Sequence, residues 1–188
     1  MLIQKIHRNG FWRLVKIYTV RVFATLRGFV FGLSNCQPIF PKTIRVGKNV
    51  ESSSRYLKVG SNVTIGSYCS FGGLGQIILA DRVVLNRNVH IDANQLIEIG
   101  EGSLIGPDCY FVDSNHVMPT DGPLISGHIV SKPIKIGKNV WIGRGVTILA
   151  GVEIGDYAVI GAGALVNKKI PSKTKAVGVP VKILENTR

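Results

Sequence analysis

Residues 134–166 read IKIGKNVWIGRGVTILAGVEIGDYAVIGAGALV. Aliphatic side chains recur there at every sixth position, and a second aliphatic series precedes the first by two positions. The first series is Ile136, Ile142, Ile148, Ile154, Ile160 and Val166, and the second is Ile134, Val140, Val146, Val152, Ala158 and Ala164. A helix repeats every 3.6 residues and a strand every two, so neither gives an unbroken period of six. A coil of three short strands does, with one hexapeptide on each side of a triangular prism. We therefore expect both series to point into such a prism.

Glycine follows four members of the first series, at Gly137, Gly143, Gly155 and Gly161. We expect these glycines at the corners of the prism, where a Cβ would obstruct the turn. The period of six also runs upstream, through three sets: Val59, Ile65 and Phe71; Leu79, Leu85 and Ile91; Ile99, Ile105 and Phe111. The steps from 71 to 79 and from 91 to 99 are eight residues long, which predicts two extra residues at one corner. The repeat thus predicts an all-β protein, a parallel β-helix of about five coils, with Val46 and Gly47 opening a further partial coil.

The charge of the chain is large and uneven. The 188 residues carry a net charge of +12, and residues 1–48 contain nine Lys or Arg and no acid. A second basic cluster consists of Lys168, Lys169, Lys173 and Lys175. Such an excess indicates an anionic partner, either nucleic acid, an anionic lipid surface or a phosphorylated small molecule. Nucleic acid is disfavoured because no recognised binding motif is present and no aromatic residues alternate with the basic ones.

Cysteine and histidine spacing argues against a metal site. The three cysteines form no CxxC pair, and Cys69 and Cys109 lie two residues before Phe71 and Phe111, on the inward series. We expect both to be core residues, and the odd count favours a reducing, cytoplasmic compartment. No HxH, HxxxH or carboxylate cluster indicates a bound metal.

Residues 1–45 are predicted to be a basic amphipathic helical segment, followed by a single β-helix domain over 46–188. The helix is expected over residues 11–33, where apolar residues share one broad face and basic residues another. The longest uncharged stretch, from Gly28 to Pro41, is too short to span a bilayer. Two interpretations remain open. The helix packs on the coils or on a neighbouring subunit, or it lies on the inner membrane surface.

One long excursion interrupts the repeat. From Phe111 to Ile136 is 25 residues, whereas the other steps are eight at most, so residues 117–133 are expected to leave the prism as a loop. Long excursions from a regular scaffold are often functional. At its base lies DSNH, Asp113 to His116. A histidine there is suited to general-base work, although it could equally be a surface residue that caps the edge of a coil.

Several motifs together resemble the hexapeptide-repeat acyltransferases, in particular the galactoside, maltose and polysaccharide O-acetyltransferase branch. They are NVWIG at 139–143, GAGALV at 161–166 with a following lysine, GVP at 178–180, and the histidine before the excursion. The resemblance covers roughly residues 57–185. It implies a left-handed parallel β-helix, a homotrimer, and acetyl-CoA bound between neighbouring prisms.

The resemblance also implies roles for individual residues. His116 matches the catalytic histidine, and Asp113 an acid found shortly before it in polysaccharide-type members. Asn86 matches an asparagine that contacts the acceptor sugar, and Lys168 a basic residue near the nucleotide phosphates. The remaining matches bind the cofactor: Trp141 beside the pantetheine arm, Arg144 at the Gly143 corner with its backbone N–H facing the thioester oxygen, and Ala162 bonding the pantetheine.

Each of these residues also has a structural explanation. Trp141 could cover the edge of a coil, Asn86 could stack in a corner ladder, and Lys168 could be a solvated charge. The N-terminal segment departs from the soluble sugar acetyltransferases and is more similar to lipopolysaccharide or capsule O-acetyltransferases. The large helical domain of serine acetyltransferases has no counterpart in the sequence.

The resemblance therefore predicts an acetyl-CoA-dependent O-acetyltransferase that modifies a sugar hydroxyl of a surface polysaccharide or its precursor. His116 would remove the hydroxyl proton, with Asp113 or a backbone carbonyl orienting its ring. Two alternatives remain: N-acetylation of an amino sugar nucleotide or an antibiotic, and a β-helix scaffold without catalysis. The protein is expected in the cytoplasm, with the inner membrane surface as a further partner.

Overall fold

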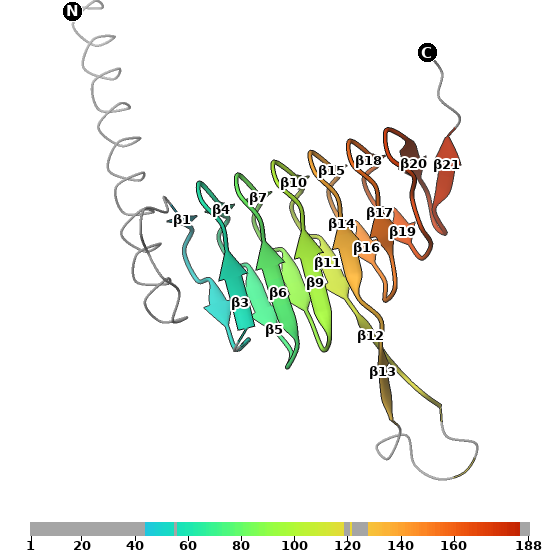
Figure 1. Cartoon of the computed structure of the whole chain (residues 1–188), viewed down its shortest axis with the longest axis horizontal. Helices are drawn as coiled ribbons and strands as arrows, with labels where there is room; N and C mark the ends of the chain where they lie inside the picture. Colours follow the sequence, from blue (N-terminus) through green and yellow to red (C-terminus); the bar gives the residue numbers. More distant parts are fainter. Residues whose placement is uncertain (1–43, 55, 119–120, 122–127, 185–188) are drawn as a thin grey trace, which may run out of the picture.

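The computed structural model describes residues 44–54, 56–118, 121 and 128–184. In these residues the chain winds into a stack of coils, and successive coils add strands to three sheets that enclose a common core (Figure 1). The predicted helix over residues 11–33 and Cys36 lie outside the described residues.

The three sheets are named here A, B and C. Within each of them the strands of successive coils pair in parallel, apart from the antiparallel final pair of sheet A. Sheet A consists of β1 (Arg45–Val46), β4 (Thr64–Ile65), β7 (Val84–Leu85), β10 (Leu104–Ile105), β15 (Trp141–Ile142), β18 (Val159–Ile160), β20 (Lys175–Val177) and β21 (Lys182–Leu184). Sheet B consists of β2 (Glu51–Ser52), β5 (Ser70–Gly72), β8 (His90–Asp92), β11 (Tyr110–Val112), β16 (Thr147–Ile148) and β19 (Leu165–Val166). Sheet C consists of β3 (Tyr56–Val59), β6 (Gln76–Leu79), β9 (Leu96–Ile99), β14 (Ile134–Ile136) and β17 (Glu153–Ile154).

The two aliphatic series form the core, as the period of six predicts. All twelve of their members are 3% exposed or less, and equivalent residues stack from coil to coil, for example Ile136 on Ile154. Cys69 and Cys109 are buried among them as free thiols. Burial raises the pKa of both thiols, as expected for side chains that lie in an apolar core.

The stack has about six turns, in agreement with the five coils and the further partial coil predicted from the sequence. The first turn contains β1, β2 and β3, and Val46 lies in β1. In β2 the residue that pairs with the buried Phe71 of the next coil is Ser52. Because a polar residue stands at this inward position, the aliphatic period reveals only the start of the first turn.

Two of the three corners share one backbone geometry. At the corners between sheets A and B and between sheets C and A, the third residue has φ between 51° and 70°; these residues are Asn49, Tyr68, Asn88, Asp108, Gly145 and Gly163 at the first corner, and Asn62, Arg82, Gly102, Asn139, Tyr157 and Lys173 at the second. The first corner residue is usually glycine. A Cβ on Gly66 or Gly106 would collide with the backbone of the next coil, which confirms the predicted role of the corner glycines.

The third corner, between sheets B and C, is where extra residues enter. Residues 72–75 and 92–95 make the longer turns expected from the eight-residue steps. The long excursion leaves at the same corner, but it begins as a hairpin rather than as a loop. Strand β12 (Ser114–His116) pairs antiparallel with β13 (Ile129–Ser131), so the departure precedes the predicted boundary at 117 (Figure 1).

Asp113 closes this corner at the root of the hairpin. Its side chain is fully buried, and its two carboxylate oxygens accept hydrogen bonds from the backbone N–H groups of Asn94, Gln95 and Leu96, at 2.7, 2.8 and 2.8 Å. These donors belong to the turn of the preceding coil. The carboxylate therefore fixes the hairpin root to the coil beneath it.

We predict that Asp113→Ala destabilises the fold strongly. The substitution leaves three backbone donors in a buried turn without their acceptor, at a cost on the order of 3 kcal/mol in the free energy of unfolding. Thermal and denaturant unfolding of the variant would measure it. His116→Ala, at an exposed position three residues later, is the control and should change stability by about 0.5 kcal/mol or less. Equal stability of the two variants would contradict the structural role of Asp113.

Candidate active site

Four of the predicted site residues lie at the corner between sheets A and B. This A–B corner is a column of three-residue turns, one per coil: 47–49, 66–68, 86–88, 106–108, 143–145 and 161–163. Gly143 and Asn86 take the first position of their turns, and Arg144 and Ala162 the central position. The structure thus brings the predicted acceptor residue and three predicted cofactor residues onto one edge of the prism.

The central residues of three of these turns, Ser67, Arg144 and Ala162, have backbone N–H groups without an acceptor in the described residues. Gly143 donates its N–H to the Ile160 carbonyl at 2.8 Å, and Gly145 donates to Pro107 at 2.9 Å. Between them, the N–H of Arg144 has no acceptor in the described part of the chain, and the same holds for Ala162. Backbone donors that are left without a partner and exposed at a corner can bind a carbonyl or amide oxygen of a ligand.

Trp141 lies beside this corner, on the outer face of sheet A. Its side chain is 56% exposed and pairs in register with Leu104 below and Val159 above. Val84 continues the column one coil further down. The outer face of sheet A therefore carries an apolar stripe from Val84 to Val159, which runs along the stack beside the A–B corner.

Asn86 points its side-chain oxygen back to its own turn. Its Oδ1 accepts the N–H of Arg87 at 2.9 Å, and the residue is exposed. Its Nδ2 has no acceptor in the described residues and remains available to a ligand. The carbonyl oxygen of Asn86 accepts from the Cys69 thiol, which ties the turn to the core.

His116 lies elsewhere, on the hairpin strand β12. It is exposed and pairs with Ile129 of β13. No hydrogen bond joins its ring to Asp113 among the described residues, and the oxygens of that carboxylate accept from the backbone of the preceding coil. These contacts give Asp113 a structural function, and the predicted orientation of the His116 ring by Asp113 stays a prediction.

The predicted residues therefore occupy two edges of sheet B. Asn86, Gly143, Arg144 and Ala162 lie at the A–B corner, whereas His116 is carried on a hairpin from the B–C corner (Figure 1). Lys168 also lies at the B–C corner, in the last turn after β19, and is exposed. No contact between the described residues joins His116 to the A–B corner within one chain.

Asp108, an acidic residue at the A–B corner, was not among the site residues predicted from the sequence. Asp108 forms an ion pair with Arg144, with 2.8 Å between Oδ2 and Nε, and its other oxygen accepts from the Asn88 amide at 3.1 Å. The hydrogen bond from Asn88 and the charge of Arg144 lower the pKa of Asp108. The length of one coil could have predicted this contact. Asn88 and Asp108 are twenty residues apart, which is one coil, so they occupy equivalent positions in neighbouring coils.

Shallow hollows lie on the outer faces of sheets B and C in the described part of the chain. One of about 370 Å³ lies on sheet B and is lined by Ser52, Ser53, Ser70 and Asp92 among others. The other, of about 500 Å³, lies on sheet C and contains none of the predicted site residues.

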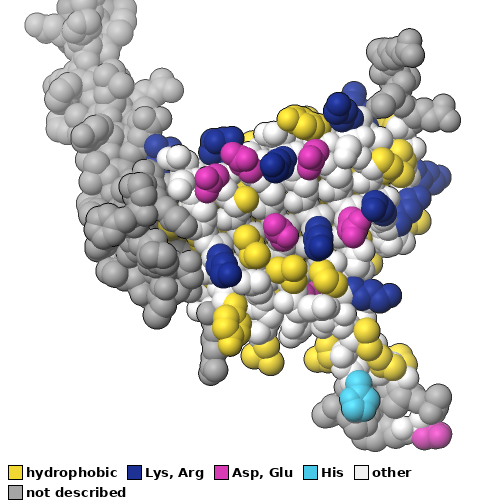
Figure 2. Space-filling model, in the orientation of Figure 1, with side chains coloured by type: hydrophobic (Ala, Val, Ile, Leu, Met, Phe, Trp, Pro, Cys, Tyr) yellow, Lys and Arg dark blue, Asp and Glu magenta, His cyan; other side chains and the backbone are white. Residues whose placement is uncertain are grey.

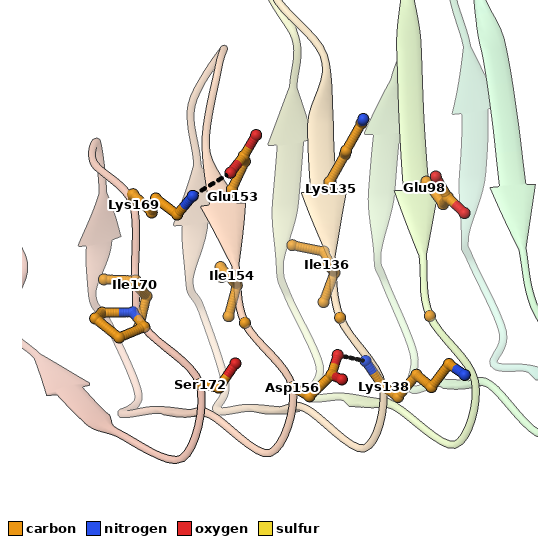
Figure 3. Close-up of a pocket in the computed structure, with 14 residues that line it drawn as sticks. Glu98, Lys135, Ile136, Lys138, Glu153, Ile154, Asp156, Lys169, Ile170 and Ser172 are labelled. Carbon is orange, nitrogen blue, oxygen red and sulfur yellow. Dashed lines mark hydrogen bonds and ion pairs between the residues drawn. The ribbon is translucent and has the colours of Figure 1, made fainter.

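The hollow on sheet C is lined by side chains of alternating charge. Glu98, Lys135, Glu153 and Lys169 follow one another from coil to coil (Figure 3), and opposite charges are interspersed over the face of the prism shown in Figure 2. Lys169 donates to Glu153 at 2.7 Å, and this hydrogen bond lowers the pKa of the Glu153 carboxyl. The charges neutralise one another, and the described residues contain no group of three His, Cys, Asp or Glu that could hold a metal ion.

Comparison with known proteins identifies the repeat. Residues 133–168 match the model of the bacterial transferase hexapeptide (six repeats). The chain is 33% identical to a putative lipopolysaccharide biosynthesis O-acetyl transferase of Escherichia coli, over 94% of this chain and 88% of the relative. It is 36% identical to the galactoside O-acetyltransferase of Escherichia coli, over 69% of this chain and 63% of the relative. A probable acetyltransferase of Mycobacterium tuberculosis is 34% identical over 90% of this chain, which spans 57% of that relative.

The fold has counterparts among solved structures. A hexapeptide-repeat-containing acetyltransferase of Vibrio cholerae, solved in complex with acetyl coenzyme A, matches 92% of this chain and 90% of its own, with a TM-score of 0.54 and 24% identity. Together with the full-length sequence match, the coils and their corner glycines show that the chain belongs to the hexapeptide-repeat acetyltransferases.

Proposed function

We propose that this protein is an acetyl-CoA-dependent O-acetyltransferase that modifies a sugar hydroxyl of a surface polysaccharide or of its precursor. The observation that carries the proposal is the A–B corner, where Arg144 and Ala162 present free backbone N–H groups beside the exposed Trp141. The acceptor class follows from the relatives, one named for lipopolysaccharide biosynthesis and another for galactosides.

The described residues fit acetyl-CoA along the two coils that contain Trp141 and Ala162. The apolar stripe that includes Trp141 and Val159 suits the pantetheine arm, and the N–H of Ala162 suits one of its amide oxygens. The N–H of Arg144, at the Gly143 corner, suits the thioester oxygen. Lys168 is exposed and has no ion-pair partner in the described chain, so its ammonium can attract a nucleotide phosphate.

The transfer requires a base and an oxyanion donor. The acceptor hydroxyl attacks the thioester carbon, the C–S bond breaks, and coenzyme A leaves as a thiolate. His116 takes the hydroxyl proton and returns it to the departing sulfur, a contribution of typically about 10²–10⁴-fold. The Arg144 N–H stabilises the negative charge that develops on the carbonyl oxygen. No nucleophilic side chain is needed, because the thiolate is a good leaving group.

A homotrimer would bring the two halves of this site together. The hairpin carries His116 away from its own A–B corner and exposes four apolar side chains, Val117, Met118, Ile129 and Val130, that a neighbouring copy would cover. In that arrangement the His116 of one copy serves the Arg144 corner of the next. A monomer that is fully active would contradict this proposal.

We predict that His116→Ala abolishes transfer but leaves the fold and acetyl-CoA binding intact. The side chain is exposed and makes no side-chain hydrogen bond within the described residues, so its loss removes the base and little else. The assay is coenzyme A release with a panel of glycans, nucleotide sugars and amino sugar nucleotides. A variant with near wild-type kcat would refute the assignment, and activity on amines alone would favour N-acetylation.

Lys168→Ala should weaken coenzyme A binding through loss of a phosphate contact. The expected result is a smaller difference in Kd between coenzyme A and its 3′-dephosphorylated form. In the wild-type protein this difference should shrink at high salt, because the Lys168 contact is exposed. Lys169→Ala is the matched control, because Lys169 is already paired with Glu153. If Lys168→Ala leaves the difference unchanged, the phosphate is bound by other residues.

The basic N-terminal segment supports a location in the cytoplasm at the inner membrane. Residues 1–48 carry nine Lys or Arg and no acid, and a lipid-linked acceptor would be reached from that surface. Within the described residues, no helix is long and apolar enough to cross a membrane.

We expect the full-length protein to float with anionic vesicles and a form lacking residues 1–35 to remain in solution. Each Lys or Arg near such a surface contributes about 1 kcal/mol. Turnover of a soluble acceptor should be largely unchanged by the truncation, and zwitterionic vesicles are the control. Failure of the full-length protein to bind anionic vesicles would leave the segment as a packing element.

A further inference from the structure

A continuous chain of hydrogen bonds crosses from the outer face of sheet B to the Arg144 turn. Ser70 Oγ lies 2.6 Å from His90 Nδ1, and His90 Nε2 lies 3.1 Å from Asn88 Oδ1. Asn88 Nδ2 donates to Asp108 Oδ1 at 3.1 Å, and Arg144 Nε donates to Asp108 Oδ2 at 2.8 Å. The five side chains come from four successive coils.

The direction of every bond in the chain follows from Asp108. An ionised carboxylate accepts hydrogen bonds and donates none, so the amide group of Asn88 that faces it is the NH₂. The amide oxygen of Asn88 therefore faces His90, whose Nε2 must carry a proton and donate it. In the neutral ring Nδ1 then accepts from the Ser70 hydroxyl.

The side chain of Arg144 adds a further contact to a turn whose backbone is hydrogen-bonded on both sides. Gly143 N–H donates to Ile160, Gly145 N–H to Pro107, and the Arg144 carbonyl accepts from Gly163 N–H. Gly145 has φ +66 with open space where a Cβ would be, so no side chain of its own packs there. The Arg144 side chain is two-thirds exposed, and the ion pair to Asp108 is the contact that binds it to the coil below.

We propose that His90 is a positioning residue for acetyl transfer, which holds Asn88 and Asp108 so that Asp108 fixes the Arg144 turn. The proposal rests on the proposed function, in which the Arg144 N–H stabilises the developing oxyanion. His90 itself does not touch the substrate. It acts through the donor at Nε2, and its Nδ1 contact with Ser70 holds the ring in place.

Two substitutions at position 90 separate the two ring nitrogens. His90→Gln places an amide donor near the position of Nε2 and retains the bond to Asn88, whereas His90→Asn reaches the position of Nδ1 and retains the bond to Ser70. Position 90 is preferable to positions 88 and 108, because both of those residues have φ near +60°, a conformation that few side chains adopt.

In the full-length protein, His90→Gln should keep kcat within about twofold of wild type, and His90→Asn should lower kcat about tenfold, part of the effect of losing one oxyanion donor. The KM for acetyl-CoA should change by less than about twofold in both variants, since the cofactor contacts remain. Thermal unfolding of the two variants should be alike. Equal kcat values for the variants, or a wild-type kcat in His90→Asn, would overturn the proposal.

The tautomer of His90 tests the same series of hydrogen bonds without an activity measurement. Long-range ¹H–¹⁵N spectra of histidine-labelled protein distinguish the two tautomers of the neutral ring. The His90 signals, identified by their absence in His90→Gln, should be those of the Nε2–H form. The Nδ1–H form would overturn the proposal even if His90→Asn failed to fold. A wild-type protein that transfers acetyl groups to no acceptor would instead contradict the proposed function.

Discussion

Every coil of this protein must lay three flat sides on the coil below it, in register, and the rest of the structure depends on that constraint. In sheet A the column Ile65, Leu85, Ile105, Ile142 and Ile160 meets it with one aliphatic residue per coil. Each such side chain, once fully buried, contributes about 1.5–3 kcal/mol. The same constraint removes the Cβ from most first corner positions, where the backbones of neighbouring coils approach closely.

The ladder was predictable from the sequence because its period is local and its residues are apolar. Only the start of the first turn was predictable, at Val46 and Gly47, since Ser52 stands where the other coils place a large apolar residue. The boundary of the excursion also differed, because three-residue strands such as β12 carry too few positions for an alternating pattern to show. The corner asparagines at 49, 62, 88 and 139 were a usable signal for positive φ, which asparagine tolerates better than most residues.

The candidate site was predictable in its residue types but not in its arrangement. Asp113 looks like a partner of His116 when read along the chain, three residues away. In space its oxygens face the turn at residues 94–96 of the preceding coil. The hydrogen bonds that join Ser70, His90, Asn88 and Asp108 were missed for the same reason. Residues that stack in neighbouring coils are about twenty positions apart, so a short sequence motif does not contain both.

The position of the free donors follows from the architecture. Strand N–H groups in a parallel β-helix are used by the carbonyls of the neighbouring coil, as for Trp141 and Thr147. Free donors are therefore expected at the corners, where the central residue of a turn faces outward. The corner turns of such a prism present backbone N–H groups to a ligand at positions set by the stacked coils. The hairpin adds residues that the period of six does not constrain. It leaves at the corner that already accepts extra residues, and the buried carboxylate of Asp113 holds its root while His116 extends beyond the prism.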